Sequence, residues 1–254
     1  MFSCGAVLTR YLYVVKIILT VLGLAEVILA GAPARAAREH YHHGALREAM
    51  IAAAEAVLAE RGLGGFTLRE CARRAGVSPA APAHHFGNLT GLLTAIATLG
   101  FEDLSNAREA AVALAQTEGG SRLAAIARAY VETALSNPGR FRVVFGQRGM
   151  DRDDPAFQAA ATRAFAILVR EVRLSRGLPT SLAPGEKPAG QALAADLPDV
   201  LLAWSTVHGF STLLIDGALD FLALEGGRQA FLDRQAARLF ALLVSALATE
   251  AEPA

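Results

Sequence analysis

The chain has 254 residues, enough for one large or two small domains, and hydrophobic residues make up 53% of it. Its 24 basic and 24 acidic residues give a formal net charge of zero, which excludes a protein that attracts nucleic acid through its overall charge. The two cysteines, Cys4 and Cys71, lie far apart and match no CxxC spacing, so we expect neither a disulfide framework nor a zinc site.

Residues 1–37 form an N-terminal extension, in which residues 11–32 are almost wholly apolar and are interrupted by the charged Lys16 and Glu26. Three interpretations stay open. The segment is long enough for a membrane helix, although two charges inside it are costly. It also has the basic start and small residues of a secretory signal. Finally, it could be an upstream stretch outside the working protein, which would then begin near Ala36.

Residues 43–61 are predicted to form the first helix of the folded part. Leu46, Met50 and Val57 recur at the spacing of one helix face, and Gly62 follows where the helix must end.

The residues before this helix, 38–43, are predicted to form an arm rich in histidine. His40, His42 and His43 could bind a metal, but their spacing gives poor geometry and no cysteine joins them. We therefore expect no metal site and interpret the segment as an arm that contacts a binding partner or as a solvated terminus.

Residues 67–86 read TLRECARRAGVSPAAPAHHF and predict two short helices joined by a tight turn. Thr67 can cap the first helix, and Gly76 stands where the chain turns with positive φ. Ser78 is predicted to cap the second helix, with Pro79 in its first position. Two helices joined in this way place the second one in the major groove of DNA, so the pattern predicts a helix-turn-helix.

The rest of the chain is predicted to be helical, with a Pro- and Gly-rich surface loop at residues 177–190. Because no segment shows convincing period-2 alternation, we predict an all-α protein. Asn88 and Asp154 are good caps for two of the helices. The predicted helices span residues 89–115, 123–135, 155–172, 192–224 and 228–249, with a short apolar segment at 141–145.

With these residues assembled, the chain resembles the TetR/AcrR family of transcriptional regulators over residues 38–100. A Trp-x-x-x-His-Gly sequence also resembles the WHG-type ligand-binding domain of some members. The matching residues are Tyr41-His42-His43-Gly44, Leu46-Arg47, Thr67-Leu68-Arg69, Ala72, Ala75-Gly76-Val77-Ser78, His85-Phe86, Leu92 and Trp204-x-x-x-His208-Gly209.

Besides the extension 1–37, the resemblance implies a three-helix DNA-binding domain at 38–90 and a regulatory domain at 91–250. A long helix would join the last two. It also implies a homodimer formed through the last two helices, a palindromic double-stranded DNA operator and a small-molecule effector. The chain departs from the family pattern at Ala83, where most members carry Tyr, and at Leu89, where most carry Lys.

Candidate DNA contacts come from the arm, the first motif helix and the second motif helix. The second helix exposes mostly apolar side chains, and His84 is its one polar group able to reach a base edge. For the arginines a solvated basic face is the alternative, and for His85 and Phe86 the alternative is packing beneath the motif. The candidates are Tyr41, His42, His43, Arg47, Thr67, Arg69, Arg73, Ser78, Ala80, Ala83, His84 and His85.

Candidate effector contacts are aromatic residues of the C-terminal part, with His208 as the polar group that such pockets need. Trp204 and His208 are four residues apart and share one helix face. The alternative is a packed helix interface in which Gly209 permits close approach. The candidates are Phe141, Phe145, Phe165, Trp204 and His208.

The sequence therefore predicts a sequence-specific DNA-binding regulator. We expect a homodimeric repressor in the cytoplasm, associated with the nucleoid and released by a small apolar or amphipathic effector. We find no catalytic constellation, so we expect neither an enzyme nor a cofactor. The alternative is a membrane-associated helical protein that has lost specific DNA reading, with membrane contact only through residues 11–32.

Overall fold

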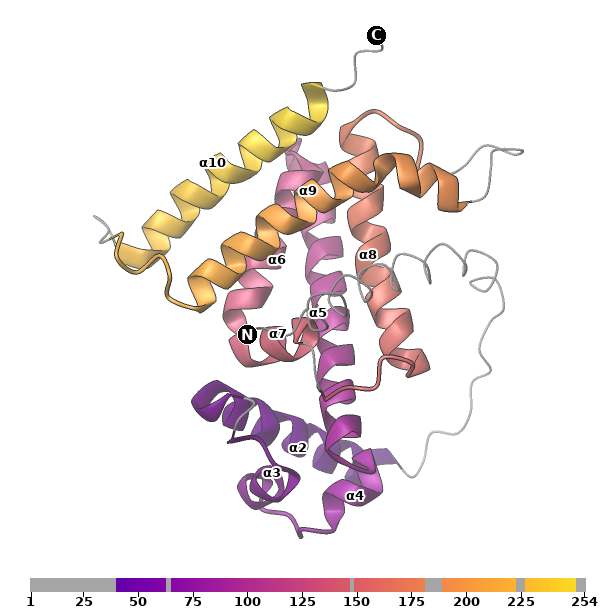
Figure 1. Ribbon diagram of the computed structural model, residues 1–254, viewed down its shortest axis with the longest axis vertical. Coiled ribbons are helices and arrows are strands. Elements are labelled where there is room, and N and C mark those ends of the chain that lie inside the picture. The colour runs from indigo at the N-terminus through magenta and orange to yellow at the C-terminus, as the bar shows by residue number, and fades with distance from the viewer. Residues whose placement is uncertain (1–39, 63–64, 147–148, 181–188, 223–226, 250–254) are drawn as a thin grey trace, which may run out of the picture. The chain divides into compact units, whose positions relative to one another are not determined.

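The computed structural model describes residues 40–62, 65–146, 149–180, 189–222 and 227–249. These residues form helices and no strand, which confirms the all-α prediction. The helices, shown in Figure 1, are α2 (His40–Arg61), α3 (Leu68–Ala75), α4 (Ala81–Phe86), α5 (Leu89–Glu118), α6 (Arg122–Ser136), α7 (Pro138–Phe145), α8 (Pro155–Ser175), α9 (Ala189–Ile215) and α10 (Gly227–Thr249).

The helices belong to two compact units. In the described parts of the chain, unit 1 comprises residues 40–101 and 137–161, and unit 2 comprises residues 102–136 and 162–249. Residues 137–161 therefore lie with the helix-turn-helix, although the predicted division assigns them to the C-terminal domain. Helix α5 is unbroken and contributes residues to both units.

Unit 1 is built on α2, which contacts both α3 and α7. The apolar face of α2 is fully buried at Met50 and Val57, as its spacing predicted. Helix α7 approaches closely because Gly139 has no side chain: a Cβ there would lie 3.1 Å from the Cβ of Leu58. An ion pair between Arg140 and Glu55 ties the same two helices together.

Local capping determines where several helices start. The side chain of Asn88 accepts a hydrogen bond from the backbone N–H of Gly91 at 3.0 Å. Asp154 accepts one from the N–H of Phe157 at 2.9 Å, directly before Pro155. Both caps were predicted, because a short polar side chain before a helix satisfies N–H groups that have no helical partner.

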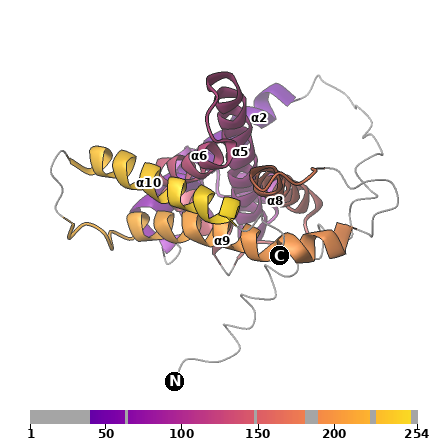
Figure 2. The ribbon, with the colours of Figure 1, turned by 90° about the horizontal axis from the view of Figure 1, so that it is seen from above.

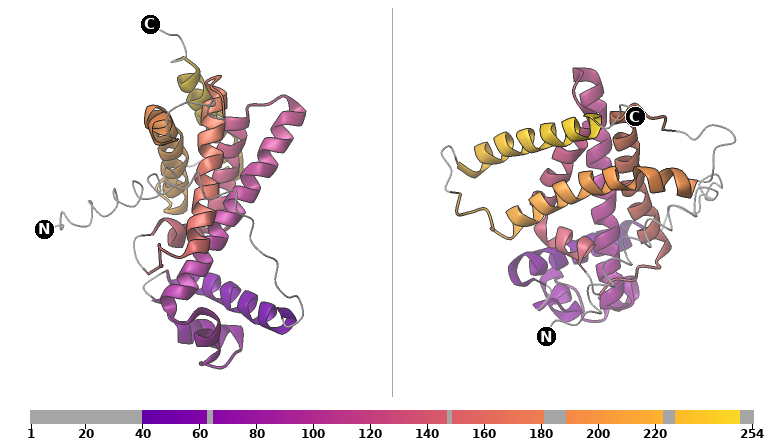
Figure 3. Two further views of the ribbon diagram at one scale, coloured as in Figure 1. Left: turned by 90° about the vertical axis from the view of Figure 1, so that its right-hand side faces the viewer. Right: turned by 45° about the horizontal axis from the view of Figure 1, so that its top comes forward.

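Unit 2 is a helical bundle in which α6 contacts both α9 and α10. Helices α9 and α10 also contact each other and run side by side (Figures 2 and 3). Its core includes Tyr130 and Ile126 on α6, Val172 on α8, Val200 on α9 and Leu247 on α10, each at most 2% exposed.

Several predicted helix boundaries differ from those of the structure. Helix α2 starts at His40, within the predicted arm. The prediction missed this start because the first turn carries no apolar periodicity that a pattern could detect. The penultimate helix ends at Ile215 and not at residue 224. Gly217 adopts φ +70° there, and the N–H of Ala218 bonds back to the carbonyl of Leu213. This closing turn stops the helix although the apolar sequence continues.

Another boundary concerns α4, which begins at Ala81 and not at Pro79. No side chain caps it, so the predicted capping role of Ser78 is wrong. Residues 78–81 form a turn instead, closed by a 3.0 Å bond from the N–H of Ala81 to the carbonyl of Ser78. A start at Ala81 puts Pro82 in the first turn, where its missing N–H costs nothing; a start at Pro79 would place it where the helix needs that donor.

Candidate nucleic-acid interface

The first helix of the predicted motif has the local structure that the sequence indicates. Thr67 caps α3 by accepting a 3.2 Å hydrogen bond from the N–H of Glu70. At the other end, Gly76 adopts φ +68°, and the N–H of Val77 bonds to the carbonyl of Ala72 at 3.0 Å. Because an L side chain is strained at that φ, glycine allows the sharp turn into α4.

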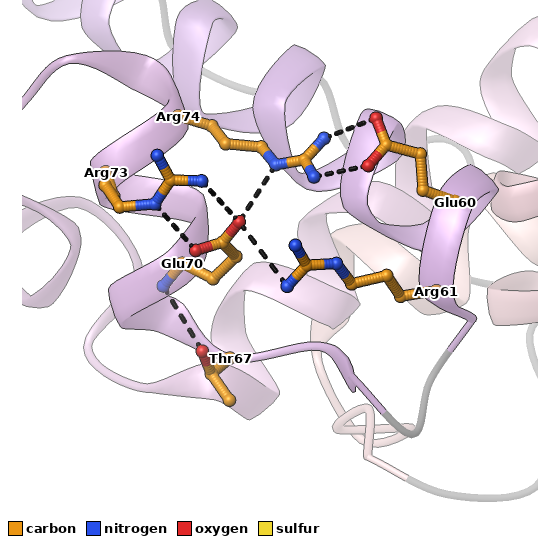
Figure 4. Close-up of polar contacts among 6 residues, drawn as sticks. All are labelled: Glu60, Arg61, Thr67, Glu70, Arg73 and Arg74. Carbon is orange, nitrogen blue, oxygen red and sulfur yellow. Dashed lines mark hydrogen bonds and ion pairs between the residues drawn. The ribbon is translucent and has the colours of Figure 1, made fainter.

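A charged network, which we call the Glu70 network, links α3 to the end of α2 (Figure 4). Arg73 donates two hydrogen bonds to Glu70, at 2.8 and 2.7 Å. Arg74 bonds Glu70 at 3.1 Å and also pairs with Glu60. Arg61 lies 3.7 Å from Glu70.

The Glu70 network neutralises most of its own charge. The hydrogen bonds from Arg73 and then Arg74 lower the pKa of Glu70 to about 2, and Arg74 also lowers the pKa of Glu60. Both carboxylates are therefore ionised at neutral pH. Three arginines oppose two glutamates, so the network retains about one positive charge for a phosphate.

Arg69 and Arg73, both predicted to contact DNA, differ in what holds them. Both side chains are exposed on α3. Arg73 is held by Glu70, whereas no ion pair of Arg69 appears within the described ranges. Arg69 is thus the arginine of α3 whose charge is least compensated.

On and before α4, the candidates Ser78, Ala80, Ala83 and His84 are all exposed. Their side chains offer two small apolar groups, one hydroxyl and one imidazole. This arrangement can make apolar contact with thymine methyl groups and few polar base contacts.

His85 and Phe86 are half-buried at the end of α4, with ring centroids 6.3 Å apart. The guanidinium of Arg47, an exposed residue of α2, lies 5.8 Å from the centroid of the Phe86 ring. Arg47 and Phe86 therefore make a contact between α2 and α4. For Phe86 this agrees with the packing alternative.

The three candidates from the predicted arm have helical backbone. Tyr41, His42 and His43 belong to the first turn of α2, and their side chains lie outside the described residues. The predicted contribution of this segment to DNA binding stays a prediction.

The five predicted effector contacts are divided between the units. Phe141 and Phe145 lie in unit 1, with ring centroids 4.9 Å apart, and Phe145 also contacts Phe101. Phe165, Trp204 and His208 lie in unit 2 and form a chain of ring contacts, each with centroids 6.4 Å apart.

Sequence reasoning missed two residues next to these rings. Tyr130 on α6 is fully buried, and its hydroxyl lies 2.8 Å from Nδ1 of His208. The guanidinium of Arg108 on α5 lies over the Tyr130 ring. One signal existed: Arg108 occupies the same apolar face of its helix as Leu104 and Val112, where a charged residue is out of place.

Two family models match this arrangement of a helix-turn-helix followed by a helical bundle. "Bacterial regulatory proteins, tetR family" matches residues 50–96, and "Tetracyclin repressor-like, C-terminal domain" matches residues 123–247. The chain belongs to the TetR family. Its TetR-type DNA-binding domain and C-terminal domain make it a DNA-binding transcriptional regulator.

Solved structures share the fold of this TetR family member. A protein of unknown function from Rhodococcus sp. RHA1 is 30% identical, with a TM-score of 0.59, over 84% of this chain and 98% of that one. A crystal structure described as "putative regulatory protein SCO4313" is 21% identical, with a TM-score of 0.60 and the same coverage, and shows the fold alone. None of the curated proteins matches the chain.

The described helices include none that is both long and apolar enough to cross a membrane. Residues 11–32, the only segment for which membrane contact was considered, lie outside the described residues. The predicted alternative for that segment stays a prediction.

Proposed function

We propose that the chain is a homodimeric repressor that binds a palindromic operator in the cytoplasm and is released by a small apolar or amphipathic effector. Effector bound in unit 2 would favour a state in which the two copies of α4 no longer fit half-sites about 34 Å apart. The ligand needs only a higher affinity for that state than for the DNA-bound one.

The observation that carries the DNA-binding part is the exposed surface of α3 and α4. Arg69 and His84 are exposed, and Thr67 and Gly76 fix the geometry of the helix that holds Arg69. A guanidinium can bind a phosphate, and an imidazole can hydrogen-bond to a base edge. Arg69 would therefore contact the DNA backbone, and His84 would contact a base.

Support for a second copy comes from apolar side chains that unit 2 leaves exposed. Leu201, Leu202 and Leu213 on α9 and Leu242 on α10 are 38%, 44%, 45% and 52% exposed. Exposed leucines on two neighbouring helices suit an interface between copies, because burying them removes apolar surface from water.

A gel-shift titration of the full-length protein against fragments of its own promoter tests the proposal. We expect a palindromic fragment to bind at least about a thousandfold more tightly than random DNA at moderate salt. Equal affinity for the two DNAs would overturn the proposal, and so would a single bound subunit per palindrome.

A further inference from the structure

Arg108 is a buried arginine in the interior of unit 2. Only 3% of the residue is exposed. Its Nη1 donates a 3.0 Å hydrogen bond to the backbone carbonyl of Ala164, and its guanidinium carbon lies 5.1 Å from the centroid of the Tyr130 ring. Its Nε–H is buried and has no hydrogen-bond partner in the described parts of the chain.

The charge of Arg108 lacks the compensation that other arginines of unit 2 have. Arg122 makes a bidentate pair with the buried Glu171, and Arg173 and Arg176 pair with Asp196 and Asp199. No carboxylate pairs with Arg108 among the described residues. Burial lowers the pKa of Arg108 to about 10, which still leaves it protonated at neutral pH. A buried cation without a counter-charge is costly, so an anionic partner would be stabilising.

The neighbours of Arg108 join this cation to an aromatic surface. The Tyr130 hydroxyl lies 2.8 Å from Nδ1 of His208 and accepts a hydrogen bond from Trp204. The Trp204 ring contacts both His208 and Phe165. A buried positive group therefore lies at one end of a set of rings, which is the pairing that an amphipathic anion needs.

We propose that the effector of unit 2 is an amphipathic monocarboxylate whose carboxylate binds Arg108 and whose apolar part lies against Trp204 and Phe165. A single negative charge balances the one guanidinium, whereas a phosphate dianion would leave a buried negative charge. This inference rests on the proposed function in one respect: unit 2 must bind the effector.

Trp204 is the only tryptophan of the chain, so its fluorescence reports binding at this place directly. The full-length protein is titrated with hexanoate, decanoate and 4-phenylbutanoate, each beside its neutral amide. We expect at least one carboxylate to bind about tenfold or more tightly than its amide. We expect Arg108→Met to remove that preference, since a hydrogen bond to a charged group contributes about a factor of ten to a hundred.

Arg163→Met is the matched control. Arg163 precedes Ala164 on α8, but it is exposed and pairs with Glu109 at 2.5 Å. We expect this variant to keep the carboxylate preference of the wild type. The proposal is overturned if no carboxylate binds more tightly than its amide, or if Arg108→Met retains the preference.

Two further measurements keep the test decisive. Arg108→Met is expected to melt at the same or a higher temperature than the wild type without ligand, because it removes an uncompensated buried charge. If it does not fold, Arg108→Gln replaces it with the same expected loss. The gel shift is then repeated with the preferred carboxylate. Arg108-dependent binding without DNA release would contradict the repressor mechanism and leave the carboxylate site standing. Normal operator binding without any preference for a carboxylate over its amide would contradict the carboxylate site and leave the DNA-binding proposal standing.

Discussion

At the scale of single residues, the proposed DNA-binding surface contains few groups that can distinguish one base from another. Ala80 and Ala83 offer only apolar contact, and His84 is the exposed imidazole of α4. We therefore expect cationic side chains such as Arg69 on α3 to make the phosphate contacts. Base recognition and phosphate contact are therefore separable by substitution.

His84→Ala is expected to reduce sequence discrimination. Loss of one base contact costs about 1–3 kcal/mol of specificity and leaves sequence-independent binding nearly unchanged. Fluorescence anisotropy with the operator and with a scrambled duplex measures both quantities. An equal loss on the two duplexes would show that His84 contacts the backbone or only supports the fold.

Arg69→Ala is expected to weaken binding to all DNA and to reduce the slope of log K against log salt by about 1. Arg73→Ala is the comparison, because Glu70 already holds that guanidinium. Its slope should change by less than that of Arg69→Ala. Titrations between 50 and 200 mM salt check this, and a reversed order would contradict the different states of the two arginines.

Glu70→Gln tests the Glu70 network through pH. The pKa of Glu70 is depressed from 4.5 to about 2, so its stabilising effect is complete above pH 4.5 and is lost as pH falls toward 2. We expect the variant to be less stable than the wild type at pH 7 and to lose less stability over that acid range. Urea unfolding at several pH values measures the difference; parallel pH curves for the two proteins would contradict it.

At the scale of helices and turns, the angle between α3 and α4 depends on one glycine. Gly76→Ala forces an alanine to φ +68°, which costs about 1–2 kcal/mol. Gly209→Ala is the contrasting change in a single copy, because its backbone is helical and the described structure leaves open space where its Cβ would go. Since Gly209 shares a helix face with Leu202 and Leu213, the comparison is made at a concentration where the protein is monomeric. That variant is expected to be more stable by about 0.5–1 kcal/mol. Thermal or urea unfolding compares the two, and similar signs would be inconsistent with this explanation.

The helices and most of their caps could be predicted from sequence because these signals are local. Thr67, Asn88 and Asp154 each accept an N–H three residues ahead, so neighbouring residues determine the cap. The start of α4 could not be read from Ser78 alone, because Pro82 decides which register the helix can adopt. The backbone turn at residues 78–81 shows the register that the helix adopts.

The environment of Arg108 was beyond prediction for a different reason. Its contacts with Tyr130 and Ala164 join residues far apart in the chain, and their pairing depends on how three helices pack. Hydrophobic periodicity predicts which side of its helix a residue occupies, but it does not identify the residues of other helices that contact it. For the same reason, the predicted aromatic set combined residues that belong to different units.

At the scale of the whole molecule, the proposed dimer is testable through the exposed leucines of α9 and α10. Leu202→Glu with Leu242→Glu places charges on the proposed interface and is expected to weaken the dimer at least about a hundredfold. Leu114→Glu is the control, since Leu114 is a similarly exposed leucine on α5. Sedimentation velocity over a concentration series measures the change. If the double variant stays dimeric at the same concentrations as the wild type, these leucines do not form the dimer interface.

The Glu70 network has a consequence for how the regulator distributes itself over a genome. Cations engaged by glutamates release fewer counterions from DNA, so affinity for arbitrary sequence should be low. Non-specific sites on a genome number in the millions. Weak binding to each of them leaves more copies of the regulator in solution and available to the operator. Few copies per cell would then keep the operator occupied, and a modest drop in operator affinity on effector binding would empty it.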